Sequence, residues 1–561
     1  MTSVGSELIH EFGVKQKMSD GVYLSSDIFR PKEDRKFPVI LTRSPYLTMN
    51  GYFERLVDDA RFFARNGYVF IIQDCRGKND SEGKYNPFHD DGKDGFDTIE
   101  WISEQPWSNG KVGMVGNSYA AWNQWATAVL NPPNLKTIIS VVALPDPVIN
   151  VPYQGGELVL TMAEWVALIE GRRNTPTAIY DTESILSHLP VREIDKMFGR
   201  NSRIWQDWLD HPSLDEYWKE TLYENKLDRV KIPAMHISGW YDDDLIGTHT
   251  NYTGIANSPS YDPKGYFQKL VIGPWPHHLN TTTNLGGIEF GPQALIDLRG
   301  LKLRWFNRFL KGENNGIDKE SPVDIFLMGI NEWSKETSWP PKNMAHKNLY
   351  LSSYFGANSL FGDGRLSENC SDKGKQYDEY IYDPSNPTPH ISEGQDLSAE
   401  GPFDQRSIER RDDVLVFQSE VLKKRMEVIG SVRLYFWAST SSVDTDYWGQ
   451  VTDVYPNGYS LHLTENIIRA KYREGLDNPK EMIPGEATPM EIDLWIVGNV
   501  FLEGHRIRLD LSSSSFPKYA RNLNNGKSNL DSSDFQVATQ RIYHGSDYMS
   551  YLQIPVRKNK K

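Results

Sequence analysis

The sequence predicts an α/β protein whose mostly parallel sheet is followed by a separate domain of antiparallel β-structure. The N-terminal part alternates short apolar runs, typical of buried strands, with amphipathic segments typical of helices. A turn that holds one serine between small residues joins one of these strands to a helix. Beyond about residue 321, short alternating runs divided by Gly, Pro, Asn and Asp replace this rhythm. A chain of 561 residues also exceeds what one hydrophobic core usually organises, so two or three domains are expected.

The predicted elements of the first domain follow one another as strand and helix. Apolar or alternating runs predict the strands, and the first helix ends at Gly67, as a C-cap glycine would end it. The predicted strands are residues 22–29, 38–42, 68–72, 111–115 and 135–143. The predicted helices are residues 58–65, 94–104 and 120–130. This order is typical of a mostly parallel sheet with helices on both faces.

The turn between the fourth strand and the third helix is the most informative segment of the chain. It reads Gly-Met-Val-Gly-Asn-Ser-Tyr-Ala-Ala, with Gly116 two residues before Ser118 and Ala120 two residues after it. A strand, a sharp turn with one serine and a helix form the nucleophile elbow of an α/β-hydrolase. Ala120 stands where the pattern usually has a second glycine, and we interpret it as a tolerated variant. A surface Gly-Asn-Ser turn is the alternative.

The rhythm changes between residues 146 and 229, where the segments look helical. One predicted helix covers residues 157–170 and ends at Gly171. Strand signals return at residues 233–238 and 269–272. We therefore expect a helical cap inserted into an α/β-hydrolase domain. The expected domains are residues 1–145 and 230–320 for the α/β-hydrolase domain, 146–229 for the cap and 321–561 for the last domain.

A long amphipathic helix over residues 292–310 is expected to close the α/β-hydrolase domain. The last domain then reads as an antiparallel β-sandwich, and we predict a jelly roll. The alternating runs that indicate its strands are residues 323–328, 348–351, 413–417, 432–437 and 506–511.

Composition excludes several classes of function. The net charge of −14 argues against a nucleic-acid or anionic-membrane partner, and no apolar stretch approaches the length of a membrane span. The last five residues, 557–561, are rich in lysine and are interpreted as a solvated tail. Residues 1–7 lack the features of a signal peptide.

The two cysteines suggest neither a disulfide framework nor a cysteine metal site, because Cys75 and Cys370 lie far apart in the sequence. We expect a cytoplasmic protein; the oligomeric state stays open.

Acyl transfer by a serine needs a base to accept its proton and a carboxylate to orient that base. In α/β-hydrolases the acid and then the histidine follow the serine along the chain, just after strand ends. Asp242 follows the strand at residues 233–238, and His277 follows the strand at 269–272. We therefore predict Ser118, Asp242 and His277 as a catalytic triad. Such a triad needs no metal or organic cofactor.

Neighbouring residues compete for two of these roles. Asp243 and Asp244 adjoin the candidate acid, although carboxylates at a helix N-terminus are an alternative interpretation for them. His278 adjoins the candidate base, and a surface histidine pair is the alternative. His236 lies inside an apolar strand and is interpreted as a core residue. A calcium loop is disfavoured because the acidic segment lacks suitably spaced ligands.

The oxyanion hole requires two donors aimed at the developing alkoxide. The backbone N–H of Tyr119, the residue after the nucleophile, is the first candidate. The loop that usually provides the second is here Thr42-Arg-Ser-Pro-Tyr46, which has no glycine-rich segment. The Tyr46 hydroxyl is a candidate donor there, but spacing alone does not separate this role from packing.

Together, these motifs resemble the CocE/NonD hydrolases, a family that includes cocaine esterase, α-amino acid ester hydrolases and X-prolyl dipeptidyl peptidases. The motifs are Arg43-Ser-Pro-Tyr46, Gln73-Asp-Cys-Arg-Gly77 with Ser81-Glu-Gly83, Gly116-Asn-Ser-Tyr119, Gly239-Trp-Tyr-Asp242 and Gly273-Pro-Trp-Pro-His277. The resemblance continues through Asp444-Thr-Asp446, Asp453-Val-Tyr-Pro-Asn-Gly458 and Ser514-Ser-Phe-Pro517. It implies an α/β-hydrolase domain, a helical cap, a jelly roll and a serine esterase or peptidase. It also implies that Tyr46 donates to the oxyanion.

The resemblance says less about the substrate. Amino-ester hydrolases of the family hold the substrate ammonium with a carboxylate cluster; here Asp244 can supply one member, but Leu245 follows it. Trp165 of the cap is a candidate for the acyl pocket, with packing inside the cap as the alternative. We expect a small ester or amide substrate of acyl or Xaa-Pro/amino-acyl type.

Two further hypotheses belong to other classes of function. An acyltransferase would use the same triad with an acceptor other than water. A carbohydrate-binding protein would use the jelly roll, with a calcium ion held by Asp444, Asp446 and Asp453.

Overall fold

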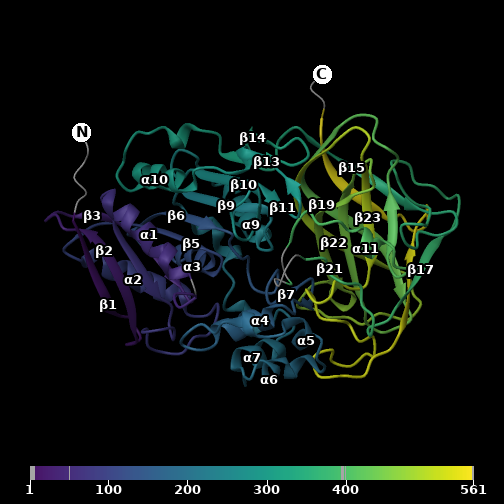
Figure 1. Cartoon of the computed structure of the whole chain (residues 1–561), viewed down its shortest axis with the longest axis horizontal. Coiled ribbons are helices and arrows are strands. Elements are labelled where there is room, and N and C mark those ends of the chain that lie inside the picture. The colour runs from purple at the N-terminus through teal and green to yellow at the C-terminus, as the bar shows by residue number, and fades with distance from the viewer. Residues whose placement is uncertain (1–6, 50, 393–396, 398–399, 559–561) are drawn as a thin grey trace.

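The computed structural model describes residues 7–49, 51–392, 397 and 400–558 (Figure 1). Residues 1–6, which make up most of the segment considered above as a signal peptide, lie outside these ranges. Residues 559–561 of the basic tail also lie outside them. Two sheet domains lie side by side along the long axis of the molecule. The cap helices lie next to the junction between them (Figure 1).

A ten-stranded sheet forms the first domain. Its strands are β1 Leu8–Lys17, β2 Tyr23–Pro31, β3 Phe37–Ser44, β4 Val69–Asp74, β5 Ser108–Asn117, β6 Leu135–Val141, β9 Ala234–Tyr241, β10 Gln268–Pro276, β13 Val323–Leu327 and β14 Glu332–Glu336. Their order across the sheet is β1-β2-β4-β3-β5-β6-β9-β10-β13-β14. All pairings from β4 to β13 are parallel, and the pairings at the two edges are antiparallel. The predicted mostly parallel sheet is confirmed.

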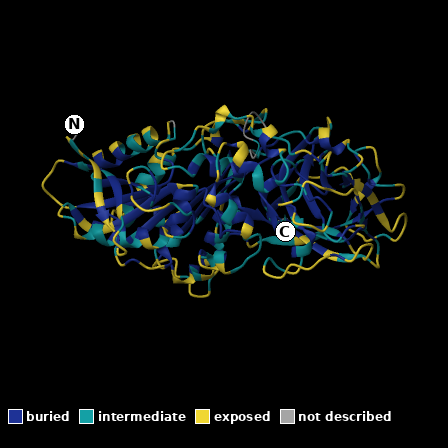
Figure 2. Cartoon of the chain, turned by 90° about the horizontal axis from the view of Figure 1, so that it is seen from below, coloured by how far each residue is buried: buried dark blue, intermediate teal, exposed yellow. Residues whose placement is uncertain are grey.

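Helices cover both faces of this sheet because successive residues of a buried strand point to opposite sides. In β5, Met114 belongs to the core shared with helices α2 (Asp91–Glu104) and α3 (Tyr119–Ala128). Its neighbour Val115 belongs to the opposite core, with α1 (Tyr52–Arg65) and α10 (Leu298–Phe309). Figure 2 shows buried residues running through the sheet and exposed residues gathered on its outer helices and loops.

Most predicted elements of this domain are present, with shifted ends. The helix expected over residues 292–310 begins only at Leu298, and residues 292–294 form a separate short 3-10 turn. The helix expected over residues 157–170 is α4, Met162–Ile169, because Glu157 and Leu158 pair instead in a short hairpin. Strand β1 was not expected from the sequence.

The cap is inserted between β6 and β9 and is mainly helical. Its elements are β7 Tyr153–Gln154, β8 Glu157–Leu158, α4, α5 Thr182–Leu186, α6 Ile194–Met197, α7 Arg203–Asp210 and α8 Glu216–Lys219. Its tryptophans pack internally: Trp165 of α4 stacks on Trp208 of α7 with ring centroids 5.9 Å apart. A further helix, α9 (Leu245–Ala256), follows β9 in the sheet domain.

Two strands that follow the domain boundary expected at residue 320 pair with the first sheet. The run at residues 323–328 was assigned to the last domain, but β13 pairs in parallel with β10, and β14 then pairs with β13. Both strands therefore belong to the first sheet. The physical reason is that an alternating apolar run fits a strand of either sheet, and its parallel partner β10 lies about fifty residues earlier in the sequence.

The C-terminal domain is a β-rich unit with largely antiparallel pairing. Its strands are β15 Met344–Ser352, β16 Gly364–Ser367, β17 Tyr377–Tyr382, β18 Leu415–Gln418, β19 Met426–Thr440, β20 Asp446–Val454, β21 Ser460–Arg469, β22 Thr488–Phe501, β23 Arg506–Ser512, β24 Ala538–Tyr543 and β25 Tyr551–Arg557. One short helix, α11 (Arg406–Glu409), interrupts them. The jelly-roll topology stays a prediction.

Within the described ranges, none of the helices combines the length and apolar character that a membrane span requires. Cys75 is buried, Cys370 is exposed, and both are free thiols.

Candidate active site

Ser118 lies at a strained turn between β5 and α3. Its φ of 58° and ψ of −127° are unfavourable for a residue with a side chain. The surrounding structure holds this conformation, since the Ser118 N–H donates to the Val141 carbonyl at 2.9 Å. A Cβ at Gly116 would lie 2.4 Å from the Ala120 carbonyl oxygen, so this position must be glycine. The variant Ala120 is fully buried and is accommodated. The turn thus has the geometry of a nucleophile elbow.

Asp242 and His277 meet at the same edge of the sheet. Asp242 directly follows β9, His277 directly follows β10, and these two strands are parallel neighbours. His277 Nδ1 lies 2.8 Å from Asp242 Oδ1. A carboxylate only accepts hydrogen bonds, so Nδ1 is the donor and Nε2 is left for another partner. Ser238 Oγ donates to the other carboxylate oxygen of Asp242 at 2.5 Å and fixes its orientation.

The competing carboxylates lie farther from the imidazole. Asp243 Oδ1 is 3.2 Å and Asp244 Oδ2 is 3.8 Å from His277 Nδ1. Asp244 occupies the N-cap position of α9, and its carboxylate accepts from Asn150 Nδ2 at 2.8 Å. Of the three carboxylates, Asp242 therefore has the shortest contact with His277.

This cluster of carboxylates changes the protonation of its members. Burial lowers the pKa of His277, but Asp243 and Asp242 outweigh it, so that the pKa is raised well above its ordinary value. Burial raises the pKa of Asp242 against the opposing hydrogen bond from His277. Burial and the adjacent charges of Asp243 and Asp242 raise the pKa of Asp244 well above normal. The neighbouring carboxylates thus stabilise the imidazolium form of His277 relative to the neutral ring.

Ser118 and His277 line two adjoining cavities, of about 830 Å³ and 530 Å³. Tyr46 and Trp165 line both cavities as well, so the four side chains surround one reaction space. The larger cavity extends between α1 and the cap. The smaller cavity is also lined by Asp244 and by residues of the C-terminal domain, which are Glu400, Phe403 and Lys518.

The two candidate oxyanion donors also adjoin Ser118. Tyr46 is 7% exposed, and burial raises the pKa of its hydroxyl, which stays neutral and able to donate. Trp165 Nε1 donates a hydrogen bond to the Tyr46 hydroxyl at 3.0 Å. Tyr119 is the first residue of α3, where backbone N–H groups have no partner within the helix.

Some contacts of the site could not be predicted from the sequence. The hydrogen bond of Trp165 to Tyr46 depends on packing between distant segments. The same is true of the cavity residues that the C-terminal domain contributes.

The other two histidines considered in the sequence lie in different surroundings. His236 is buried and contacts Gln268 Oε1 at 2.9 Å, as expected of a core residue, and burial lowers its pKa to about 4. His278 lines both cavities beside His277.

Among the residues that the structure describes, two groups of side chains have the spacing of metal ligands, but both have protein partners. The first is the cluster of Asp242, Asp243, Asp244 and His277, and the second is His390, Glu400 and Glu465. In the second group the Lys518 ammonium pairs with both glutamates. These contacts satisfy the carboxylates without an ion.

The calcium site considered for the C-terminal domain does not form from the three expected residues. Asp446 and Asp453 lie at the two ends of strand β20, seven residues apart, which corresponds to about 23 Å. Asp446 pairs with Arg469 at 3.0 Å, whereas Asp453 contacts His505 at 2.8 Å. One ion cannot bind both carboxylates, so this part of the carbohydrate-binding hypothesis is wrong.

The parallel sheet, the elbow and the histidine–carboxylate pair at one edge define the α/β-hydrolase class. Residues 20–279 match the model of the X-Pro dipeptidyl-peptidase (S15) family, and residues 315–553 match the X-Pro dipeptidyl-peptidase C-terminal non-catalytic domain. The chain is 35% identical to cocaine esterase of Rhodococcus sp., over 96% of this chain and 97% of that protein. It belongs to the CocE/NonD family of serine hydrolases.

Two solved structures show the same architecture over nearly the whole chain. An α-amino acid ester hydrolase is 27% identical with a TM-score of 0.86, and covers 99% of this chain and 98% of its own. An aminopeptidase from the marine sediment archaeon Thaumarchaeota archaeon is 25% identical with a TM-score of 0.85. The match covers 99% of this chain and 97% of the aminopeptidase. The inserted cap and the C-terminal domain are therefore shared features of this fold.

Proposed function

We propose that Ser118, His277 and Asp242 are the catalytic triad of this hydrolase, and that it cleaves small esters or amides through an acyl-enzyme. The observation that carries the proposal is the 2.8 Å contact between His277 and Asp242, which leaves Nε2 of the imidazole available beside the cavities that Ser118 lines. An orienting carboxylate, a base and a serine at a strained elbow are what acyl transfer by serine requires.

In the proposed reaction, neutral His277 accepts the Ser118 proton as the hydroxyl oxygen attacks the substrate carbonyl. Asp242 stabilises the imidazolium that forms. The Tyr119 N–H and the Tyr46 hydroxyl donate to the oxyanion, and the protonated imidazole then gives its proton to the leaving group. Water, activated by the same histidine, releases the acyl group. The Tyr46 hydroxyl has its proton free for this role because it accepts from Trp165.

The two cavities support a substrate with groups on both sides of the scissile bond. The smaller cavity has apolar walls that include Phe88, Met162 and Trp165, which suit an acyl or aromatic group. Asp244 lies in the same cavity and can contact a polar group of the substrate. The family and its relatives cover esters and amino-acyl or Xaa-Pro substrates, so we propose this range for the chain.

Turnover of a panel of p-nitrophenyl acyl esters, amino-acyl esters and Xaa-Pro substrates tests the proposal. Ser118→Ala should abolish turnover of every accepted substrate and should also abolish labelling by a fluorophosphonate. Retained labelling at another residue would overturn the assignment of the nucleophile. Adding alcohol or amine acceptors and analysing the products separates hydrolysis from acyl transfer.

A further inference from the structure

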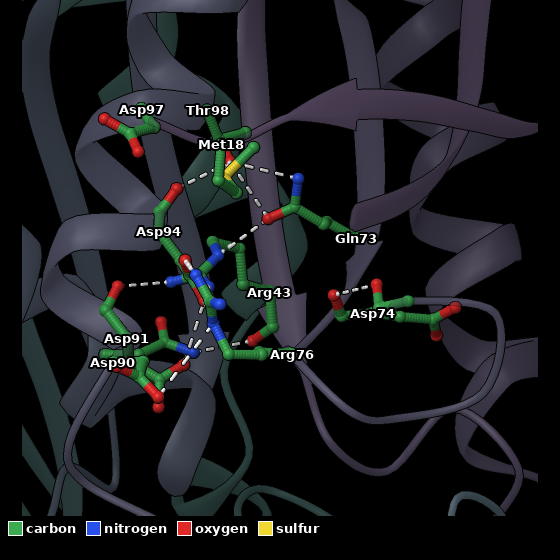
Figure 3. A network of polar contacts seen from close by, with 12 residues as sticks. Met18, Arg43, Gln73, Asp74, Arg76, Asp90, Asp91, Asp94, Asp97 and Thr98 are labelled. Carbon is green, nitrogen blue, oxygen red and sulfur yellow. Dashed lines mark hydrogen bonds and ion pairs between the residues drawn. The ribbon is translucent and has the colours of Figure 1, made fainter. Parts of the chain in front are cut away.

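A buried polar network connects the segment that carries Tyr46 to the elbow that carries Tyr119. Its centre is Arg43, at the end of β3, three residues before Tyr46 and 0% exposed (Figure 3). Arg43 Nη1 donates to the backbone carbonyl of Asp91 at 2.6 Å, and Nε donates to Gln73 Oε1 at 2.7 Å. The Arg43 Nη2 atom lies 3.6 Å from Asp91 Oδ1.

The other carboxylate oxygen of Asp91 binds the elbow. The Tyr119 hydroxyl donates to Asp91 Oδ2 at 2.5 Å, and the same hydroxyl accepts from the Phe88 N–H at 2.8 Å. Asp91 is 5% exposed and Tyr119 is fully buried, so water does not compete for these contacts. Asp91, the first residue of α2, thus has one oxygen facing Arg43 and the other bonded to Tyr119.

The two segments joined in this way carry the two proposed oxyanion donors. An oxyanion hole works only when both donors are held at fixed positions around one oxygen atom. Here one donor is a backbone N–H on α3 and the other is a hydroxyl on the loop after β3. Asn123 Nδ2 of α3 also donates to the Arg43 carbonyl at 2.9 Å, which fixes the same two segments against each other.

The motif at residues 73–77, which the triad does not use, builds the surroundings of this network. Gln73 Oε1 accepts from Arg43 Nε, and Cys75, two residues after Gln73 in this motif, is buried. Arg76 pairs with Asp94, one turn along α2 from Asp91, at 2.5 Å (Figure 3). The guanidinium groups of Arg43 and Arg76 offset the cost of burying the Asp91 and Asp94 carboxylates.

We propose that Asp91 is a positioning residue for catalysis: through Tyr119 and Arg43 it holds the two halves of the oxyanion hole in register. This inference rests on the proposed function, because it assumes that Tyr46 and the Tyr119 N–H stabilise the oxyanion. Asp91 itself does not reach the substrate and acts only through its two neighbours.

The test compares Asp91→Asn and Tyr119→Phe with the unchanged protein in p-nitrophenyl ester hydrolysis. Both variants should lower kcat by about tenfold or more with little change in KM, since a misplaced donor weakens transition-state binding only. Asp94→Asn is the matched control, because Asp94 is equally buried and pairs with Arg76 and Arg43 rather than with Tyr119. It should lose much less kcat, even where its thermal midpoint falls as far. If Asp91→Asn fails to fold, Tyr119→Phe, which lacks only one hydroxyl, carries the test.

A double-mutant cycle with Tyr46→Phe separates positioning from general destabilisation. When the Tyr46 donor is already removed, Tyr119→Phe or Asp91→Asn should cost clearly less kcat than in the unchanged protein. Full additivity in the cycle, or equal losses for Asp91→Asn and Asp94→Asn, would overturn the inference. Failure of the proposed function looks different: Ser118→Ala or Tyr46→Phe alone would then leave turnover intact.

Discussion

The indole N–H of Trp165 donates a hydrogen bond to the Tyr46 hydroxyl over 3.0 Å. Trp165 belongs to α4 of the cap, whereas Tyr46 lies after β3 in the sheet domain, so the cap contacts a proposed catalytic group directly. A tyrosine hydroxyl has one proton to donate. Because Trp165 uses the hydroxyl oxygen as an acceptor, that proton can point toward Ser118, which lines the same two cavities as Tyr46.

Tyr46→Phe is expected to lower kcat by about 10² to 10³, the usual loss for one oxyanion donor. KM should change little, because the hydroxyl binds the oxyanion more strongly than it binds the ground-state carbonyl. Steady-state kinetics on one p-nitrophenyl ester measure both constants. Fluorophosphonate labelling of Ser118 gives the fraction of intact sites. Unchanged turnover of every accepted ester would contradict the role of Tyr46.

Trp165→Phe keeps an aromatic ring in the cavity wall but removes the hydrogen-bond donor. We expect kcat to fall by about threefold to tenfold, since a neutral hydrogen bond contributes on the order of 1 kcal/mol. The same substitution in the Tyr46→Phe background removes no such bond and should leave kcat nearly unchanged. An equal loss in both backgrounds would mean that Trp165 acts by packing against the substrate instead.

Gly116→Ala should impair both folding and activity. The added Cβ would lie 2.4 Å from the Ala120 carbonyl oxygen and 2.7 Å from the Ala120 Cβ. Such overlap in a packed turn costs about 1–3 kcal/mol and moves Ser118. Ala120→Gly should not restore the protein, because the carbonyl oxygen remains in place. Urea denaturation and ester turnover check the two effects, and a full rescue by Ala120→Gly would contradict this account.

The sequence was sufficient to predict the parts of the fold that depend on local pattern. Buried apolar runs such as residues 38–42 and 68–72 are strands β3 and β4, and the order of strands places Asp242 and His277 at one sheet edge. This works because the carboxyl ends of parallel strands meet at the same side of a sheet. Two local signals therefore fix a long-range contact.

Contacts between segments that do not pair as neighbouring strands could not be predicted in this way. Asp91 lies three residues before the helix predicted over residues 94–104, although the observed helix begins at Asp91 itself, and nothing in the sequence points to its contact with Tyr119. Trp165 fits packing inside the cap equally well. Strand β13 is a different case: it does pair with a neighbouring strand, β10, but its apolar alternation is the same as in the strands of the other sheet, so the sequence did not show which sheet it joins.

The activity should depend on the charge of Asp243. The base form of His277 must be neutral, and the neighbouring carboxylates raise its pKa well above the ordinary value. The acid limb of kcat/KM is therefore expected above the pH at which a free imidazole titrates. Asp243→Asn removes one negative charge, lowers the pKa of His277 and shifts this limb to lower pH. Profiles of kcat/KM between about pH 5 and 9 measure the shift.

Asp243→Glu is the control for that experiment, since it keeps the negative charge near His277. Its acid limb should stay close to that of the unchanged protein. A limb that moves to higher pH in Asp243→Asn would contradict the electrostatic account.

The cap and the C-terminal domain should unfold more easily when Glu157 is neutralised. Glu157 of β8 is fully buried and forms an ion pair with Arg469 of β21, which also contacts Asp446 at 3.0 Å. Removing one partner of a buried pair usually costs about 3–5 kcal/mol, but Asp446 still faces the guanidinium, so we expect about 1–3 kcal/mol for Glu157→Gln. The urea midpoint measures this loss. Glu7→Gln, at an exposed pair with Lys32, should leave the midpoint unchanged, and an equal shift in both variants would show that burial of the pair is not the cause.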